Sequence, residues 1–333
     1  MADLTTSYMG LALENPIIAG ASSLTQNVDS IRKLEDAGAA ALVISSLFEE
    51  QIQLDHLKMS EDIAQYDDWH AEMTSVFPRL EHSGPDSHLM WVRRAKEAVD
   101  IPVIASLNAI HAATWVEWAK RLADTGVDAL ELNFFALPRE FDARSEEIED
   151  QQVEALEGVK RQVAIPISVK LSPYYTSPLH FIRRLDAIGV DGFVLFNRFF
   201  QPKIDIDGER NDLSFNLSSE NDHRISLRFA GILYGKIKAS ICASNGIHTA
   251  ENAIELLLAG ADVVQVVSTL FKNSVGYLRT MAEEIERWMD KKGYAGIEDF
   301  RGKMSKEKNP DDWAYTRGQY VMTLLRAQDY LKT

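Results

Sequence analysis

The chain has 333 residues, of which 46% are hydrophobic and 26% are charged, a composition typical of a globular protein with a large core. Its 35 lysines and arginines stand against 50 acidic residues, and the formal net charge of −15 argues against binding to nucleic acid. The single cysteine, Cys242, excludes an internal disulfide and a cysteine-ligated metal or iron–sulfur site.

The N-terminal stretch has neither a basic region nor an apolar region, so it does not resemble a signal peptide. No uninterrupted apolar run approaches the roughly 18 residues that a membrane-spanning helix needs. We therefore expect a cytoplasmic protein that does not bind membranes. Because Cys242 lies in an apolar run, we expect it to be a small buried core residue.

Short apolar segments that indicate buried strands alternate along the chain with amphipathic segments that indicate helices. The predicted strands are 17–21, 40–45, 103–107, 129–133, 167–171, 192–196, 240–244 and 263–267. The predicted helices include 28–37, 114–125, 146–162, 178–188, 249–258 and 276–291, with a tail helix at 313–331. Strands that are continuously apolar are buried on both faces, as in a parallel sheet covered by helices.

Glycine recurs at four of the predicted helix-to-strand junctions, at Gly38, Gly126, Gly189 and Gly260. A left-handed glycine ends a helix and lets a short loop enter the next strand. Repeated strand–helix units of this kind predict an α/β fold, a (β/α)8 TIM barrel with an extra C-terminal helix. The alternative is a doubly wound open sheet, but no Gly-x-Gly-x-x-Gly follows the first strand.

Two insertions, 47–100 and 198–229, follow strands and therefore emerge at the C-terminal face of the barrel. We expect the first to form helices beside the barrel mouth, and the second to contain a turn at 205–208. The aromatic and large apolar residues of the first insertion include Tyr66, Trp69, Met73 and Phe77. Since no low-complexity linker divides the chain, we expect one barrel domain over residues 1–303 and a helical tail, 304–333, packed on it.

Polar side chains follow the predicted strands at the end where barrel enzymes carry their active sites. They include Asn108, Asn133 and Asn197 and, at the end of the fifth strand, Lys170. A side-chain amide offers two donors and an acceptor in a fixed geometry, which suits the imide or ureide groups of a ligand. A single asparagine more often satisfies loop backbone, but three of them together with a lysine predict a ligand site.

Lys170 needs an anionic partner, because an isolated buried ammonium group is costly. Glu131 on the neighbouring strand is one candidate, and an anionic cofactor such as reduced flavin is the other. Residues 244–246 and 268–269 follow the seventh and eighth strands, where this fold usually binds phosphate. Together these features favour FMN.

Several of these strand-end segments match one known family in collinear order, from about residue 8 to about residue 303. They are 15–16, 45–46, 131–133, 169–174, 197, 245–247 and 292–302. With them the chain resembles the dihydroorotate dehydrogenase family of FMN barrels, and among these the class 1 enzymes. The resemblance implies an oxidoreductase of pyrimidine metabolism in which hydride passes from a dihydropyrimidine-like substrate to flavin N5.

The resemblance also implies partners and site residues. It implies FMN as cofactor, a homodimer, and a separate electron-transfer partner to carry any iron–sulfur cluster. Lys170 would contact the N1/O2 edge of the flavin, residues 245–246 and 268–269 the phosphate, and Asn133 and Asn197 the substrate amides. The residues expected to bind the cofactor are Ala21, Ser22, Ser45, Asn108, Asn133, Lys170, Asn197, Ser244, Asn245, Gly246, Ser268 and Thr269.

The loop after the fourth strand departs from the family pattern. The family has Asn-x-Ser-Cys/Ser-Pro-Asn there, and its Cys or Ser is the base that removes the C5 proton, whereas residues 133–138 read Asn-Phe-Phe-Ala-Leu-Pro. We therefore assign no catalytic residue, and His111, His223 and Tyr174 are the candidates for a replacement base. A family lysine expected near position 44 or 45 is also missing.

Three functions are compatible with the sequence. The first is an FMN oxidoreductase that acts on dihydroorotate or on a different substrate. The second is a non-catalytic or electron-relay protein that keeps the flavin fold and binds a partner through its tail or its first insertion. The third is a barrel that binds a sugar phosphate without redox chemistry.

Overall fold

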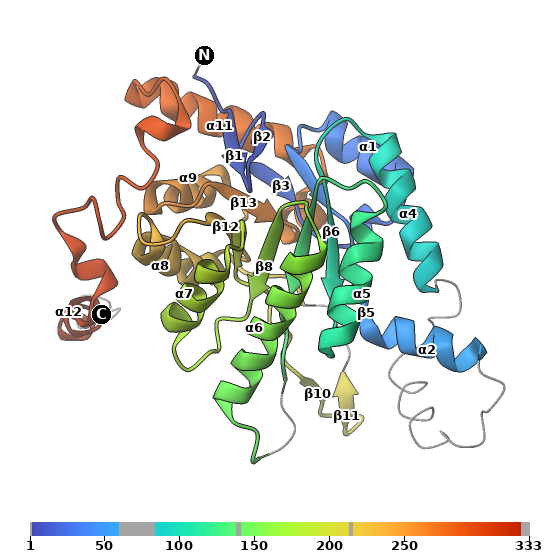
Figure 1. The fold of residues 1–333 in the computed structure, drawn as a ribbon. Helices are drawn as coiled ribbons and strands as arrows, with labels where there is room; N and C mark the ends of the chain where they lie inside the picture. Colours follow the sequence, from blue (N-terminus) through green and yellow to red (C-terminus); the bar gives the residue numbers. More distant parts are fainter. Residues whose placement is uncertain (1, 60–83, 138–140, 213–215, 328–333) are drawn as a thin grey trace.

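The computed structural model describes residues 2–59, 84–137, 141–212 and 216–327. Within these residues, eight parallel strands form a closed barrel, as predicted (Figure 1). The strands are β3 (Ile17–Ala19), β4 (Ala41–Val43), β6 (Val103–Asn108), β7 (Ala129–Asn133), β8 (Ile167–Leu171), β9 (Gly192–Leu195), β12 (Ser240–Ser244) and β13 (Val263–Val266). They pair in the order β4-β3-β13-β12-β9-β8-β7-β6, and pairing of β4 with β6 closes the ring. The short strand β5 (Leu47–Phe48) pairs with the end of β6.

Helices on the outside of the barrel connect the strands (Figure 1). They are α1 (Val28–Asp36), α4 (Pro85–Ala98), α5 (Ala112–Ala123), α6 (Ser145–Gln162), α7 (Pro178–Ile188), α8 (His223–Leu233), α9 (Ala250–Ala259) and α11 (Tyr277–Lys292). Helix α5 begins two residues before its predicted start. The Glu49 carboxylate accepts hydrogen bonds from the N–H groups of Ile110 (2.5 Å) and His111 (3.0 Å), which fixes the chain where it enters this helix.

An antiparallel hairpin of β1 (Thr6–Tyr8) and β2 (Leu11–Leu13) closes the N-terminal end of the barrel. The Met9 N–H donates to the hydroxyl of Ser240, the first residue of β12 (3.2 Å), and Tyr8 is 1% exposed. Cys242 is fully buried in the same core, which confirms its predicted role, and burial raises the pKa of its thiol. Because this end is filled, a ligand site has to lie at the opposite, C-terminal end.

The insertions lie at that C-terminal end. In the first, α2 (Glu49–Met59) is the described helix that follows β5, and the predicted residues Tyr66, Trp69, Met73 and Phe77 lie outside the described residues. In the second, β10 (Lys203–Asp205) and β11 (Arg210–Asp212) form a hairpin. The predicted turn is confirmed, because the Asp205 carboxylate accepts hydrogen bonds from the N–H groups of Asp207 and Gly208, both at 3.2 Å.

The tail is more broken than the predicted helix at 313–331. A 3-10 turn over Asp312–Tyr315 is followed by α12 (Arg317–Leu325), which has no buried residue. Thr316 between them is extended, with φ −113° and ψ 177°, and caps α12 through its hydroxyl. Tyr315 anchors the tail by donating to the Met304 carbonyl (2.6 Å), whereas α12 lies at the periphery (Figure 1). The division into residues 1–303 and 304–333 stays a prediction.

No helix among the described residues is long and apolar enough to cross a membrane.

His88 in α4 makes the stability of this fold dependent on pH. Its Nε2 atom is buried and has no hydrogen-bond partner among the described residues, and burial lowers the pKa of the imidazole from 6.5 to about 4. The unfolded chain therefore binds this proton more readily than the folded chain. The contribution of His88 to the free energy of unfolding is constant above about pH 6.5. It falls by about 2–3 kcal/mol as the pH drops from there to about 4. Urea unfolding of wild type and His88→Leu across this range measures the effect, and equal pH dependence in both proteins would contradict it.

Candidate functional site

A cavity of about 320 Å³, the first cavity, opens at the C-terminal ends of the barrel strands. Loops after β3, β9, β12 and β13 surround it, together with Lys170 of β8 and Gln265 of β13. Besides Lys170, most of the predicted cofactor-binding residues line it: Ala21, Ser22, Asn197, Ser244, Asn245, Gly246 and Ser268. Barrel closure therefore brings these residues, which lie far apart in the sequence, to one cavity.

The other predicted residues, Ser45, Asn108, Asn133 and Thr269, do not line this cavity. Asn133 lies next to it, because its side-chain oxygen accepts a hydrogen bond from the amide of Asn197 (2.9 Å). Thr269 is fully buried, and its hydroxyl donates to the His248 carbonyl (3.0 Å), so this hydroxyl supports the loop. Asn108 is the last residue of β6 and pairs with Phe48 of β5, and Ser45 lies two residues after the end of β4.

The Lys170 ammonium group takes part in a buried polar chain in the barrel interior. It donates to the side-chain oxygen of Gln265 (2.7 Å), and the Gln265 amide donates to the Glu131 carboxylate (2.8 Å). The Lys170 nitrogen also lies 3.6 Å from a Glu131 oxygen, so Glu131 is the ionic neighbour that the sequence indicated. Lys170 is 8% exposed and lines the cavity, whereas Glu131 is 1% exposed and lies below it. Lys170 therefore places a positive charge in the cavity wall, and Gln265 and Glu131 bind its ammonium group from the barrel interior.

The loop after β12 has a backbone that approaches α8 closely. Asn245 and Gly246 are both left-handed, with φ of 76° and 73°. A Cβ atom on Gly246 would lie 2.7 Å from the Asp222 carbonyl carbon and closer still to the His223 backbone nitrogen. Only glycine fits this position, because it combines a positive φ with backbone contact. Successive N–H groups in such a turn form a concave site suited to an anion.

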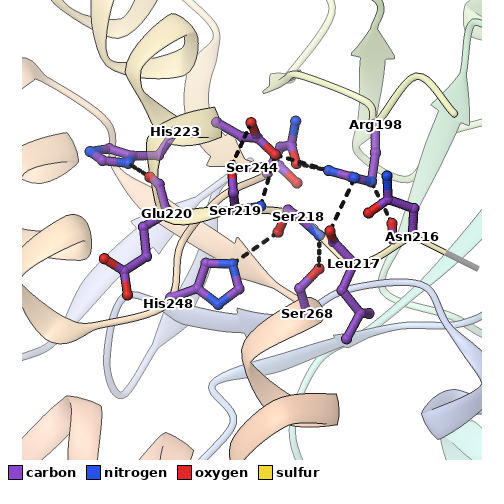
Figure 2. A network of polar contacts seen from close by, with 12 residues as sticks. Arg198, Asn216, Leu217, Ser218, Ser219, Glu220, His223, Ser244, His248 and Ser268 are labelled. Atoms are coloured by element: carbon purple, nitrogen blue, oxygen red, sulfur yellow. Dashed lines mark hydrogen bonds and ion pairs between the residues drawn. The ribbon is translucent and has the colours of Figure 1, made fainter. Parts of the chain in front are cut away.

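Arg198, which sequence analysis did not identify, lines the first cavity beside Asn245. Figure 2 shows its polar contacts. Its guanidinium group pairs with the Asp222 carboxylate at 3.0 Å and donates to the carbonyls of Asn216 (2.8 Å) and Leu217 (3.1 Å). Burial by itself would raise the pKa of Asp222. The hydrogen bonds from Ser219 and Arg198 outweigh this effect, so the pKa is below its ordinary value. Arg198 thus adds a second positive charge to the lining and holds residues 216–217 beside the cavity.

Ser218 fixes the same segment from its other side (Figure 2). Its N–H donates to the Ser268 hydroxyl (3.0 Å), its hydroxyl lies 3.1 Å from His248 Nε2, and its carbonyl accepts from the Lys272 ammonium group (2.9 Å). Burial, followed by the Lys272 charge, lowers the pKa of His248. The Ser268 hydroxyl oxygen accepts this hydrogen bond, and the hydroxyl proton can be donated to a ligand.

The three candidate bases are placed differently, and none of them lines the first cavity. His223 is buried in α8 and bound through both ring nitrogens, to the Glu220 carbonyl and to the Glu255 carboxylate (2.7 Å). His111 has its Nδ1 2.5 Å from Glu49, with the side chain 64% exposed. Tyr174 is 70% exposed, with its ring against Phe199.

The loop after β7 carries apolar residues where the resemblance implies a base. Phe134 is buried and packs edge-on against Trp115, with ring centroids 5.2 Å apart. Phe135 stacks on Phe199 at 5.4 Å. Ala136, at the implied base position, has no group that takes up a proton. These contacts show that Phe134 and Phe135 are packing residues, and neither side chain is an acid or a base.

The polar residues that sequence analysis missed are Gln265, Arg198 and His248. Gln265 had a visible signal, because it is the only polar residue in the apolar run 263–267. A buried glutamine in a strand needs partners, so this position marked a polar layer in the barrel. Arg198 and His248 stand in polar loops, where one more polar residue carries no signal.

Comparison with known proteins gives a consistent result. A family model described as dihydroorotate dehydrogenase matches residues 80–289. The catalytic subunit of dihydroorotate dehydrogenase B (NAD(+)) from Thermoplasma acidophilum is 27% identical over 307 residues, which is 91% of this chain and 99% of that protein. Dihydroorotate dehydrogenase A (fumarate) from Lactobacillus helveticus is 31% identical over 210 residues, 62% of this chain and 68% of that protein. The corresponding B-type subunit from Methanosarcina mazei is 27% identical, with 90% and 94% covered.

Proposed function

Because the chain belongs to the dihydroorotate dehydrogenase family, we propose that it is an FMN-dependent oxidoreductase that takes hydride from a dihydropyrimidine-like substrate. The observation that carries the proposal is the buried Lys170 ammonium group in the wall of the first cavity. When bound, FMN supplies the N5 atom that accepts hydride. A fixed cation beside the N1/O2 edge favours the negative charge that reduction adds there.

The residues of the first cavity fit a cofactor with a ring system and a phosphate group. Its volume of about 320 Å³ lies in the range of about 300–1,000 Å³ that is usual for small-molecule sites. Lys170 supplies positive charge on the barrel side. Asn245 and Gly246 offer backbone N–H groups beside the Arg198 guanidinium on the other side. The non-catalytic and sugar-phosphate alternatives have no feature of comparable specificity in their favour.

This placement supports the following roles for the residues of the site. Lys170 holds the charge at the ring end, while residues 245–246 and the Ser268 hydroxyl bind the phosphate. Asn133 and Asn197 orient the amide groups of the substrate. Because these two asparagines share one hydrogen bond, each keeps further donors and acceptors for a ligand. Ser45 and Asn108 would complete the ring pocket on the β6 side, and Thr269 would stabilise the phosphate loop from behind.

Dihydroorotate is a poor substrate for this arrangement, because Ala136 replaces the implied base. A missing general base lowers a rate by about 10²–10⁴-fold. The purified protein should therefore bind FMN, and dihydroorotate should bleach the visible flavin absorbance slowly under anaerobic conditions. Ala136→Cys should accelerate this bleaching, whereas Ala136→Val, which fills the same position without a thiol, should not.

The possible outcomes separate cofactor from substrate. A protein that takes up no FMN contradicts the flavin function itself. Stoichiometric FMN uptake with no bleaching in wild type or Ala136→Cys removes dihydroorotate as the substrate and leaves the flavin site in place. We also propose a separate electron-transfer partner, which is supported by the relatives that are named as catalytic subunits. A homodimer and a cytoplasmic location are proposed from the family resemblance alone.

A further inference from the structure

A second cavity, of about 380 Å³, lies at the same end of the barrel. The loops after β7, β8 and β9 form it, together with the first turns of α6. The segment 197–201 separates it from the first cavity. Arg198 and Phe200 line the first cavity, whereas Phe199 and Gln201 line the second. Neighbouring side chains of this segment thus line two different cavities. Most of the residues assigned to FMN line or adjoin the first cavity, whereas Ala136, the implied base position, lines the second.

Aromatic rings form one wall of the second cavity. Tyr174 meets Phe199 edge-on, with ring centroids 5.4 Å apart and planes at 77°. Phe199 is in turn stacked on Phe135, which holds its ring in place from behind. Tyr174 is 70% exposed and projects from the loop after β8. An aromatic wall that is held in place but open to solvent is suited to stacking against a planar ring.

The charge of the second cavity is negative. Among the described residues that line it, Glu149 of α6 is the only one with a full charge at neutral pH. The Glu149 side chain is 12% exposed. The guanidinium group of Arg184 lies 3.6 Å from a Glu149 oxygen, but its shorter ion pair, at 2.5 Å, is with Asp150. Burial raises the pKa of Tyr175, another wall residue, and the Glu149 charge raises it further, so the field of this carboxylate acts at the cavity wall.

We propose that the second cavity binds a planar aromatic ring that carries a cationic group of the amidine type, and that it excludes carboxylates. The ring stacks on Tyr174 and Phe199, while the cation pairs with Glu149 through charge-assisted hydrogen bonds. The net charge of the chain, −15, also disfavours the binding of carboxylates at this site. The site uses no residue assigned to FMN, so it stands or falls independently of the flavin.

Three probes that share one ring test this assignment: benzamidine, benzamide and benzoate, which are cationic, neutral and anionic. Isothermal titration calorimetry on the full-length protein should show saturable binding in the order benzamidine, then benzamide, with no saturation by benzoate. Glu149→Gln should weaken benzamidine about tenfold or more and leave benzamide unchanged. Tyr174→Ala, at an exposed position that the fold does not depend on, should weaken both ligands about 3–10-fold.

Glu147→Gln is the matched control, because Glu147 lies on the same helix, is exposed, and does not line the cavity. It removes the same charge and should leave benzamidine binding unchanged. The proposal is overturned if benzoate binds as tightly as benzamidine, or if Glu147→Gln weakens benzamidine as much as Glu149→Gln does. Unchanged binding of both rings to Tyr174→Ala overturns it as well. Each measurement is made with and without FMN, and equal results in both support a separate site.

Discussion

Replacing Lys170 with methionine will lower the free energy of unfolding by about 3 kcal/mol, because the change leaves a buried carboxylate without its cation. Glu131 is 1% exposed, and in wild type it has the Lys170 nitrogen at 3.6 Å and the Gln265 amide at 2.8 Å. Methionine fills a similar volume, so the loss reports the charge and not a cavity. Urea unfolding at neutral pH measures the difference.

The double variant Lys170→Met with Glu131→Gln separates stability from function. Neutralising both partners removes the unpaired charge, so most of the lost stability should return. The cation facing the first cavity is still missing in this protein. FMN bound to it should therefore be harder to reduce, with a reduction potential lower than wild type by about 30–65 mV.

Two results would count against this account of Lys170. A double variant as unstable as the single one would show that packing, and not charge, sets the cost. A folded double variant whose bound FMN has the wild-type potential would show that Lys170 does not face the flavin.

Gly246→Ala will cost about 2–5 kcal/mol of folding free energy and will sharply reduce FMN uptake. The new Cβ atom adds about 1–2 kcal/mol for the left-handed backbone and about 1–3 kcal/mol for overpacking. The two nearest atoms it meets are backbone atoms of Asp222 and His223, and the third is the Asp222 Cβ, so none of them can rotate away. Relief of the clash has to move either the start of α8 or the loop after β12, and both movements displace the N–H groups proposed to bind phosphate.

Gly189→Ala is the matched control, because Gly189 has a φ of 90° and its added Cβ would meet no atom within 4 Å. It should cost only about 1–2 kcal/mol, from the backbone alone, and should leave FMN uptake unchanged. Equal losses of stability in the two variants would show that the close approach at Gly246 has no energetic consequence. Urea unfolding and the ratio of bound flavin to protein measure both effects.

Some elements were predictable to the residue and others were not. The strands at 129–133, 167–171 and 240–244 have the predicted bounds. The tail helix was predicted as one element over 313–331 and is observed as α12, Arg317–Leu325, after a separate turn. The extended backbone at Thr316 and the anchoring of Tyr315 on Met304 depend on a surface that the local pattern does not describe.

The sequence by itself determined the barrel and the set of polar groups at its mouth, because apolar runs, helical periodicity and junction glycines are local properties of the chain. Only the tertiary structure decided which hydrogen-bond partner within the chain each of these polar groups has. Gln265 reaches Lys170 across 95 positions and Glu131 across 134, and Arg198 reaches Asn245 across 47. Such contacts exist only once the ring of strands is closed, because closure sets which strand ends face one another. The separation of two cavities by residues 197–201 has the same origin.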